Sequence, residues 1–439
     1  MKANKPQKNN SSNWQLIPTG EIFMFVKSYA FPRENLSNGI LSPDKIGNVH
    51  YGDIHATFTS KNIDLSKIEI PIVKEAEFSP KKEDLLKDGD LIMADVSEDY
   101  DGIGATVLVH GIGKNKVVGG LHTFVLRDKK GLTSEYYRQY IFLNKDIRNK
   151  LQKVANGVSV YGISKTTLSK IGLPLPPLPE QNRIVSILET WDKSIEKLAK
   201  KIDAKKQIKK GLMQDLLTNN KRLKGFNDGL EIIEIGNLGE YYSGISGKDK
   251  EDFGFGKPFI SYMNIYLNSK IDINIKDLVN IMDGEKQNKV KYGDLFFTTS
   301  SETSEEVGVA SVLLDKNVGE IYLNSFCFGF RLHDFNKLIP EFAQYYFRSR
   351  PFRKSMFEIA QGATRFNLSK KYFVQTKIKI PRDIREQKAI ADILTTADKE
   401  IAKLENKLQI FKEQKRYLLN NLITGTIRTP ETLSAKIVK

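Results

Sequence analysis

A repeated stretch constrains the fold of this chain more than any other feature. Residues 180–218 return without a gap as residues 386–424, so that Glu180-Gln181 aligns with Glu386-Gln387 and Leu216 with Leu422. Shared composition alone would not preserve an ungapped register over this length. The chain is therefore predicted to consist of two repeats.

Both copies of the stretch are predicted to be long helices. A helix of about 38 residues would extend about 57 Å, which is too long for one buried helix of an ordinary domain. Pro177 and Pro179 lead into the first helix, and Asp383 with Glu386 has the spacing of a capping box before the second. Apolar residues recur at steps of three and four, as in the seam of a coiled coil, at Ile184, Leu188, Trp191, Ile195, Leu198, Ile390, Leu394, Ile401, Leu404 and Leu408. Each helix is expected to pack against a partner helix.

Composition limits the class of protein. A chain of 439 residues with 40% hydrophobic residues supports two to four packed domains. The net charge of +15 favours a polyanionic partner, with nucleic acid ahead of a merely solvated lysine-rich surface. A single cysteine, Cys327, excludes an internal disulfide framework and fits a reducing compartment. Without a signal-like start or a long apolar run, we expect a cytoplasmic protein that does not contact membranes.

The pattern along the chain predicts an α+β fold with two domains. The first domain should contain strands at 89–94, 105–109 and 123–126, followed by one helix over 134–154. The predicted boundaries are a disordered tail at 1–13, domain 1 at 14–179, the central long helix at 180–222, domain 2 at 223–382, the C-terminal long helix at 383–425 and a tail at 426–439.

Domain 2 repeats domain 1 at several points. Gly293-Asp294-Leu295 echoes Gly89-Asp90-Leu91, and Gly362 with Ser369-Lys370 echoes Gly157 with Ser164-Lys165. The openings at 47–54 and 257–265 show no close correspondence. One scaffold with two divergent faces is expected where each domain reads something different.

Catalytic motifs are missing from the sequence. The only Pro-Pro pair, Pro176-Pro177, lacks the acid and aromatic of an amino-methyltransferase turn, and no Gly-Lys pair completes a P-loop. Pro43-Asp44 is not followed by the carboxylate-x-Lys of a magnesium nuclease, and the five histidines are scattered, with only His50 and His55 close in sequence. We expect a protein without catalytic residues, metal or cofactor of its own.

Two loops before the long helices combine groups that suit DNA. Residues 155–165 and 360–371 carry a glycine, hydroxyls and amides suited to base edges, an aromatic residue, and basic groups suited to phosphate. A polar loop with a lysine is usually only solvated, but recurrence at the same place in both repeats favours binding. The expected DNA contacts, from these loops and the two openings, are Tyr51, Ser159, Tyr161, Lys165, Lys257, Ser261, Tyr262, Asn264, Arg365, Asn367, Lys370 and Lys371.

The order of these features resembles the specificity subunit of type I restriction-modification systems over nearly the whole chain. The resemblance rests on the alternation of divergent domains with long helices, and on the helix entries at Pro177-Leu178-Pro179-Glu180-Gln181 and at Ile380-Pro381 with Glu386-Gln387. The second entry, Arg382-Asp383-Ile384-Arg385, is less proline-rich than the first.

The resemblance implies that the two helices form an antiparallel coiled coil with a recognition domain at each end. Each domain would enter the major groove of one half of a split site in double-stranded DNA. The subunit itself would catalyse nothing. It would bind two methyltransferase (modification) subunits, which carry S-adenosylmethionine and methylate adenine, and through them the restriction motor-nuclease subunits, which use ATP and Mg.

Two other classes of function compete with this interpretation. A coiled-coil adaptor with two protein-binding domains would share the architecture, but its binding would lack the steep salt dependence of a DNA reader. A fused methyltransferase with a degenerate motif would bind S-adenosylmethionine as an isolated chain.

Overall fold

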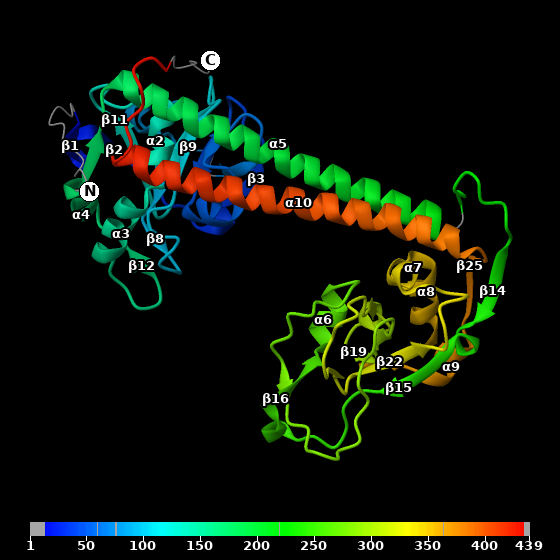
Figure 1. Ribbon diagram of the computed structural model, residues 1–439. Coiled ribbons are helices and arrows are strands. Elements are labelled where there is room, and N and C mark those ends of the chain that lie inside the picture. The colour runs from blue at the N-terminus through cyan, green and yellow to red at the C-terminus, as the bar shows by residue number, and fades with distance from the viewer. Residues whose placement is uncertain (1–13, 59, 75–76, 219, 363, 434–439) are drawn as a thin grey trace, which may run out of the picture. The chain divides into compact units, whose positions relative to one another are not determined.

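The computed structural model describes residues 14–433 except 59, 75–76, 219 and 363 (Figure 1). The tail predicted at 1–13, and the last part of the C-terminal tail, lie outside the described residues. The chain divides into two compact units, and each is described separately below. Unit 1 comprises the described residues of Met1–Leu198 and Lys407–Lys439, and unit 2 comprises those of Ala199–Asn406.

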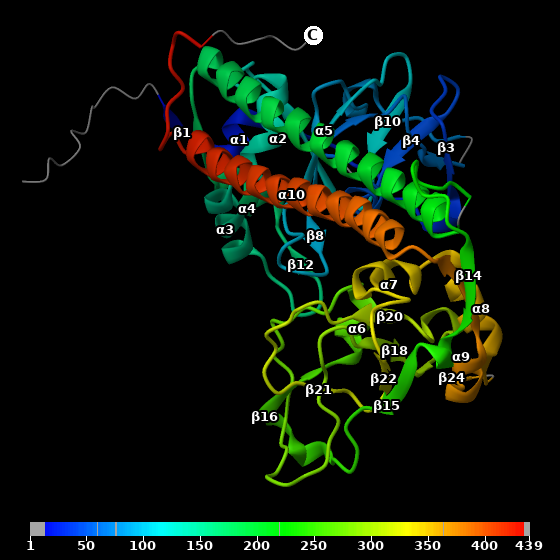
Figure 2. The same ribbon diagram turned by 45° about the vertical axis from the view of Figure 1, so that its right-hand side comes forward.

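The two long helices predicted from the repeat are confirmed as α5 (Leu178–Leu217) and α10 (Ile384–Ile423), with 40 residues each. In unit 1 the start of α5 lies beside the end of α10, where Trp191 and Phe411 meet edge to face at 5.2 Å between ring centres (Figures 1 and 2). In unit 2 the end of α5 lies beside the start of α10, where Lys205 pairs with Glu400 at 2.8 Å. The helices are therefore antiparallel within each unit.

The predicted seam residues differ in burial along the helices. Ile184 and Leu188 join the core of domain 1 together with Leu422, and Ile390 and Leu394 join the core of domain 2. Each pair of helix ends is thus continuous with the core of the domain in its own unit. Leu198 and Ile401 are also buried, whereas partial exposure is found at Trp191, Ile195, Leu404 and Leu408.

Domain 1 is built on two sheets. The five-stranded sheet runs in the order β2 (Phe23–Val26), β11 (Thr123–Asp128), β7 (Leu91–Ala94), β9 (Thr106–His110) and β5 (Asn62–Asp64). The four-stranded sheet runs β10 (Lys116–Gly119), β4 (Ile46–Val49), β6 (Ile70–Val73) and β3 (Leu36–Gly39). Two strand pairs and short helices complete it: β1 (Gln15–Pro18) with β13 (Gly172–Leu175), β8 (Val96–Ser97) with β12 (Tyr161–Gly162), α1 (Thr19–Ile22), α2 (Glu135–Ile141), α3 (Lys145–Val154) and α4 (Lys165–Lys170).

The three strands predicted in domain 1 are confirmed as β7, β9 and β11, but the single helix predicted over 134–154 is wrong. The chain breaks between α2 and α3 at Asn144, which has extended backbone angles. Its Oδ1 accepts hydrogen bonds from the backbone N of Asp146 (2.9 Å) and of Ile147 (3.2 Å), so Asn144 caps a new helix. Apolar spacing continues across this break, which is why the sequence pattern does not reveal it.

Domain 2 repeats this architecture with smaller sheets. Its main sheet runs β15 (Gly239–Ser243), β22 (Cys327–Leu332), β18 (Leu295–Thr298) and β20 (Ala310–Val312). The remaining sheets are β17 (Leu278–Val279), β16 (Phe253–Ile260) and β21 (Tyr322–Leu323); β19 (Ser300–Ser301), β24 (Phe366–Leu368) and β23 (Ala360–Gln361); and β14 (Leu230–Glu234) with β25 (Lys377–Pro381). The helices are α6 (Tyr262–Leu267), α7 (Pro340–Tyr346), α8 (Arg350–Ile359) and α9 (Lys370–Gln375).

The openings of the two domains, residues 47–54 and 257–265, occupy corresponding places in the fold, although their sequences show no close correspondence. β4 pairs in parallel with β10, which sets Val49 opposite Gly119, and β16 pairs in parallel with β21, which sets Ile260 opposite Leu323. A helical turn follows each strand, as a π-helix at Asp53–Thr57 and as α6. The two segments share little more than a tyrosine and a buried isoleucine, Tyr51 with Ile54 and Tyr262 with Ile265.

Among the described residues, no helix combines the length and the apolar character needed to cross a membrane.

Candidate nucleic-acid interface

The two predicted loops share a turn that requires glycine. Gly157 has φ +144° and Gly362 has φ +134°, a backbone region that other residues rarely enter. A Cβ on Gly157 would lie 1.8 Å from the Val160 carbonyl oxygen, and one on Gly362 would lie 2.0 Å from that of Arg365. Both the conformation and the space exclude a side chain, so each loop folds back on itself in the same way.

Each loop is fastened to a short strand that continues from the main sheet. In domain 1, β12 pairs with β8, and Tyr161 packs on Tyr100 with ring centres 4.1 Å apart. In domain 2, β24 pairs with β19, and the side-chain oxygen of Asn367 accepts a hydrogen bond from the Ser300 hydroxyl. Asn367 is therefore already engaged within the chain, while its side chain remains exposed.

A lysine follows each loop and sits over an aromatic ring. Lys165 Nζ lies 4.9 Å from the ring centre of Phe25, and Lys370 Nζ lies 5.5 Å from that of Tyr241. The two rings occupy corresponding positions on the edge strands β2 and β15. Burial lowers the pKa of Lys370. The site is not closed to solvent, because Tyr241 is 48% exposed. Sequence reasoning missed both rings, since they lie far from the lysines along the chain.

Other loop side chains point outward. Ser159, Arg365 and Lys371 are exposed. The Arg365 guanidinium lies 5.9 Å from the ring centre of Phe326, which is itself 55% exposed. The structure thus brings the loop of domain 2 together with a turn that the sequence did not single out.

In domain 1, Tyr51 is surrounded by histidines. Its ring centre lies 4.7 Å from that of His50, 6.2 Å from that of His55 and 5.5 Å from that of His122. The expectation that the histidines are scattered is therefore wrong for these three, because His122 reaches the others only through the fold. Within the described part of the chain, no group of three or more His, Cys, Asp or Glu residues is arranged to hold a metal ion.

The predicted contacts in the opening of domain 2 interact with their own chain. Asn264 accepts from the backbone N of Asp272 (3.0 Å) and donates to its carbonyl oxygen (2.8 Å). Lys257 pairs with Glu320 at 3.0 Å, and this hydrogen bond raises the pKa of Lys257. Tyr262 is half-buried and stacks on Tyr266 with ring centres 6.2 Å apart, whereas Ser261 lies just before α6 without capping it.

An arginine lies just after each repeated stretch and forms a salt bridge with the glutamate in the first turn of the other long helix. Arg428 donates to Glu180 through Nε (2.6 Å) and Nη2 (2.7 Å), and Trp14 adds a third hydrogen bond to the same carboxylate. Arg222 donates to both carboxylate oxygens of Glu386. Arg222 and Arg428 are in register in the two repeats, so extending the repeat past its helices would have found them.

Of the two side chains in the capping box predicted at the start of α10, that of Asp383 caps the helix and that of Glu386 does not, so half of this prediction is wrong. Asp383 does cap the helix, because its Oδ1 accepts from the backbone N of Arg385 at 2.8 Å. The Glu386 carboxylate turns to Arg222 instead of back to the backbone. The charged partner is the stronger donor, which explains the choice.

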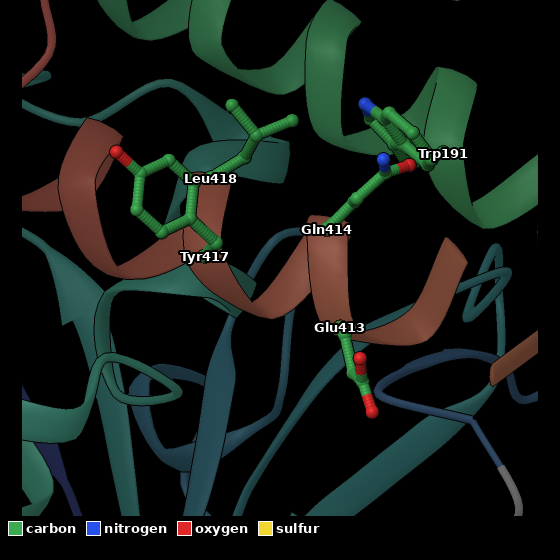
Figure 3. A pocket seen from close by; sticks show the side chains of 5 residues that line it. All are labelled: Trp191, Glu413, Gln414, Tyr417 and Leu418. Carbon is green, nitrogen blue, oxygen red and sulfur yellow. The ribbon is translucent and has the colours of Figure 1, made fainter. Parts of the chain in front are cut away.

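A hollow of about 540 Å³ lies between α5 and α10 in unit 1 (Figure 3). Trp191 comes from α5, and Gln414 points toward it from α10, while Glu413 points away. Tyr417 and Leu418 line the same hollow. The repeat alignment places Ala397 and Gly211 at the positions of Trp191 and Tyr417 in the other copy, so the aromatic lining belongs to one unit only.

Comparison with known proteins agrees with the duplicated plan. Residues 11–206 and residues 227–411 each match the family described as "Type I restriction modification DNA specificity domain". The chain belongs to this family of specificity subunits. It is 28% identical, over 95% of its length and 94% of the relative's, to a putative type I restriction enzyme MjaX specificity subunit from Methanocaldococcus jannaschii. It is 23% identical to the EcoKI specificity subunit of Escherichia coli K12, over 68% of this chain and 64% of that one.

Solved structures share the fold of this specificity subunit. A chain from a study of complex assembly and conformational transition of the type I R-M system superposes with a TM-score of 0.63 and 17% identity, covering 96% of this chain and all of that one. The HsdS subunit from Thermoanaerobacter tengcongensis gives a TM-score of 0.51 with 16% identity, covering 96% and 99% of the two chains.

Proposed function

We propose that this specificity subunit reads a two-part DNA site, with domain 1 on one half-site and domain 2 on the other. One observation carries the proposal: the loops at Gly157 and Gly362 have the same backbone but present different side chains. Tyr161 and Val160 in the first loop stand where Phe366 and Arg365 stand in the second. A common frame with different exposed groups is what two readers of different base sequences require.

We further propose that α5 and α10 form an antiparallel coiled coil that separates the two domains. Support comes from matched contacts within the units. Asp192 pairs with Lys415 and accepts from Tyr140 in unit 1, while Asp398 pairs with Lys209 in unit 2. These ion pairs join the helices in the same antiparallel sense at both ends.

The helices are also the proposed docking surface for two methyltransferase subunits, and through them for restriction subunits. The helical stretches keep their sequence between repeats while the domains diverge, as expected if they serve equivalent partners. S-adenosylmethionine, ATP and Mg would be bound by those partners, and the chain itself would be non-catalytic. The double variant Leu198→Asp with Leu404→Asp should then abolish co-purification with the methyltransferase, because it places unpaired charge in the seam. Full stoichiometry in that variant would refute the seam assignment.

The two-part reading is tested by methylome sequencing of cells with and without this subunit and its methyltransferase. The expected result is one split motif, methylated only when both proteins are present. Binding of that motif by the assembled complex should weaken steeply with salt, by about 0.9 in the logarithmic slope for each phosphate contacted. Salt-independent binding, or methylation at a continuous motif, would overturn the proposal.

A further inference from the structure

A turn that the sequence did not single out lies directly beside each predicted loop. In domain 1 the backbone N of Asp95 donates to the His122 carbonyl oxygen at 3.1 Å, and the Asp95 carbonyl oxygen accepts from Ile163 N at 2.8 Å. The backbone N–H and the carbonyl oxygen of Asp95 therefore bind the turn that ends at His122 and the loop that ends at Ile163, respectively.

Domain 2 repeats these bonds. The backbone N of Thr299 donates to the Phe326 carbonyl oxygen at 3.0 Å, and the Thr299 carbonyl oxygen accepts from Leu368 N at 2.8 Å. The strand that follows also starts in register, since Thr123 lies opposite Ala94 and Cys327 lies opposite Thr298. His122 and Phe326 thus occupy the same position in the two domains.

The backbone and side-chain contacts of His122 hold its ring in place. It has φ +54°, and among the described residues it is the one non-glycine residue with positive φ. Its Nδ1 lies 3.2 Å from the Asp95 carboxylate, and its ring packs edge to face on Tyr51. The side chain is still 46% exposed, so Nε2 is the ring nitrogen through which it can meet a partner.

Phe326 presents the opposite chemistry at this position. Its ring is more than half exposed and carries no polar group, and the Arg365 guanidinium lies over it. Exposed large apolar side chains are common on protein surfaces, so exposure alone means little. The informative feature is a repeated position, beside a repeated loop, that is occupied by imidazole in one domain and by phenyl in the other.

We propose that His122 and Phe326 each contact a base edge, and that they set the base preference at one position of their respective half-sites. This inference rests on the proposed DNA-reading function. With its Nδ1–H directed at Asp95, a neutral imidazole can accept a hydrogen bond at Nε2 from the amino group of adenine or cytosine, and a phenyl ring can pack on the methyl group of thymine.

A base contact explains the position better than a phosphate contact does. The Asp95 carboxylate lies 3.2 Å from Nδ1 of the His122 ring, and its negative charge disfavours an approaching phosphate. A phenyl ring offers a phosphate no hydrogen bond at all. A position that changes from histidine to phenylalanine between the domains therefore fits readout of differing bases and not a shared grip on the backbone.

The test uses the full chain assembled with its methyltransferase subunits and its own target, in competition against single-base variants of both half-sites. His122→Gly removes the ring and suits the positive φ, while His110→Ala changes a histidine at the far end of β9. Phe326→Ala removes the second ring, and Phe335→Ala changes an exposed phenylalanine beyond the other end of β22. Each test variant should lose about tenfold in discrimination at one position of one half-site, the scale of a good base contact, and neither control should change.

The outcomes separate this inference from the function on which it rests. Uniform weakening across all sequences, or unchanged preferences in a complex that still reads both half-sites, would overturn the assignment of His122 and Phe326 alone. A wild-type complex that prefers no sequence would overturn the two-part reading itself. If His122→Gly lowers the melting temperature, His122→Asn replaces it, because asparagine tolerates positive φ and should prefer adenine through N6 and N7. A preference of His122→Asn for any base other than adenine at this position would count against the assignment.

Discussion

The two recognition domains share their internal frame but differ on the surface beside it. In both, a buried aspartate just before an inner strand (β7 or β18) binds an arginine that is the second-last residue of the adjacent strand (β11 or β22). Arg127 donates to Asp90 at 2.9 and 2.6 Å, and Arg331 donates to Asp294 at 2.9 and 2.7 Å. Beside this frame, by contrast, Asp95 and His122 of domain 1 correspond to Thr299 and Phe326 of domain 2.

This difference shows which interactions can vary between the repeats. A buried carboxylate must keep its partner, because an unpaired charge in the interior is costly. Side chains that project from a loop into solvent have no such requirement, so they can change without unfolding the domain. The conserved frame and the variable face are therefore two results of one physical constraint.

The largest expected effect comes from breaking the frame in either domain. Asp90→Asn and Asp294→Asn each leave an arginine without its carboxylate, and each should cost its own domain about 3 to 5 kcal/mol of stability. Hydrogen exchange resolved by segment would measure the loss in each domain separately. A large loss in one domain and none in the other would show that the frames are not equivalent.

A smaller and more local effect is expected at the loop glycines. Gly157→Ala and Gly362→Ala each force a Cβ against a carbonyl oxygen, with strain of about 1 to 3 kcal/mol, and should weaken recognition of one half-site each. Gly131→Ala and Gly284→Ala are matched controls, because both glycines have positive φ but open space around the added Cβ. Equal damage from the controls would mean that the backbone angle, and not the collision, decides the loop shape.

Sequence reasoning recovered the parts of the fold that repeat. The ungapped register fixed both long helices, and the Gly-Asp-Leu strands located both central strands. It missed contacts between residues far apart in the chain, such as His122 against Tyr51, because three-dimensional proximity there arises only from strand pairing. The alignment of the two repeats ended at Thr218 and Thr424 and so missed Arg222 and Arg428, which align with each other four residues further along.

Comparable effects are expected from the two arginine clamps at the helix ends. Arg428→Ala and Arg222→Ala each remove hydrogen bonds to a buried glutamate and should cost about 1 to 3 kcal/mol. Exchanging the charges in unit 2, with Arg222→Glu and Glu386→Arg together, should recover part of the loss if the ion pair itself matters. Thermal and denaturant unfolding of single and double variants would measure the coupling.

Acid should release the clamp in unit 1. Burial alone would raise the pKa of Glu180, but its hydrogen bonds to Arg428 and Trp14 lower the pKa overall. A carboxylate with a lowered folded pKa stabilises the protein above its unfolded pKa, and this contribution is lost as pH falls through the folded value. The Arg428→Ala variant should therefore lose less stability than the wild type on acidification, and parallel losses would contradict the linkage.

The smallest expected effect comes from exchanging one exposed side chain between the equivalent loops of the two domains. Arg365 and Val160 occupy the same loop position, and the Arg365 guanidinium leans over the ring that we assign to a base. With that ring on the base, the guanidinium is best placed for a neighbouring phosphate, so Arg365→Val should weaken binding to every sequence alike and reduce the salt slope by about one unit. Val160→Arg should increase the slope by a similar amount, because it adds the same group to domain 1. Relaxed choice at a single base in Arg365→Val would instead make the arginine a base reader, and relaxation in both half-sites would contradict the division of the site between two domains.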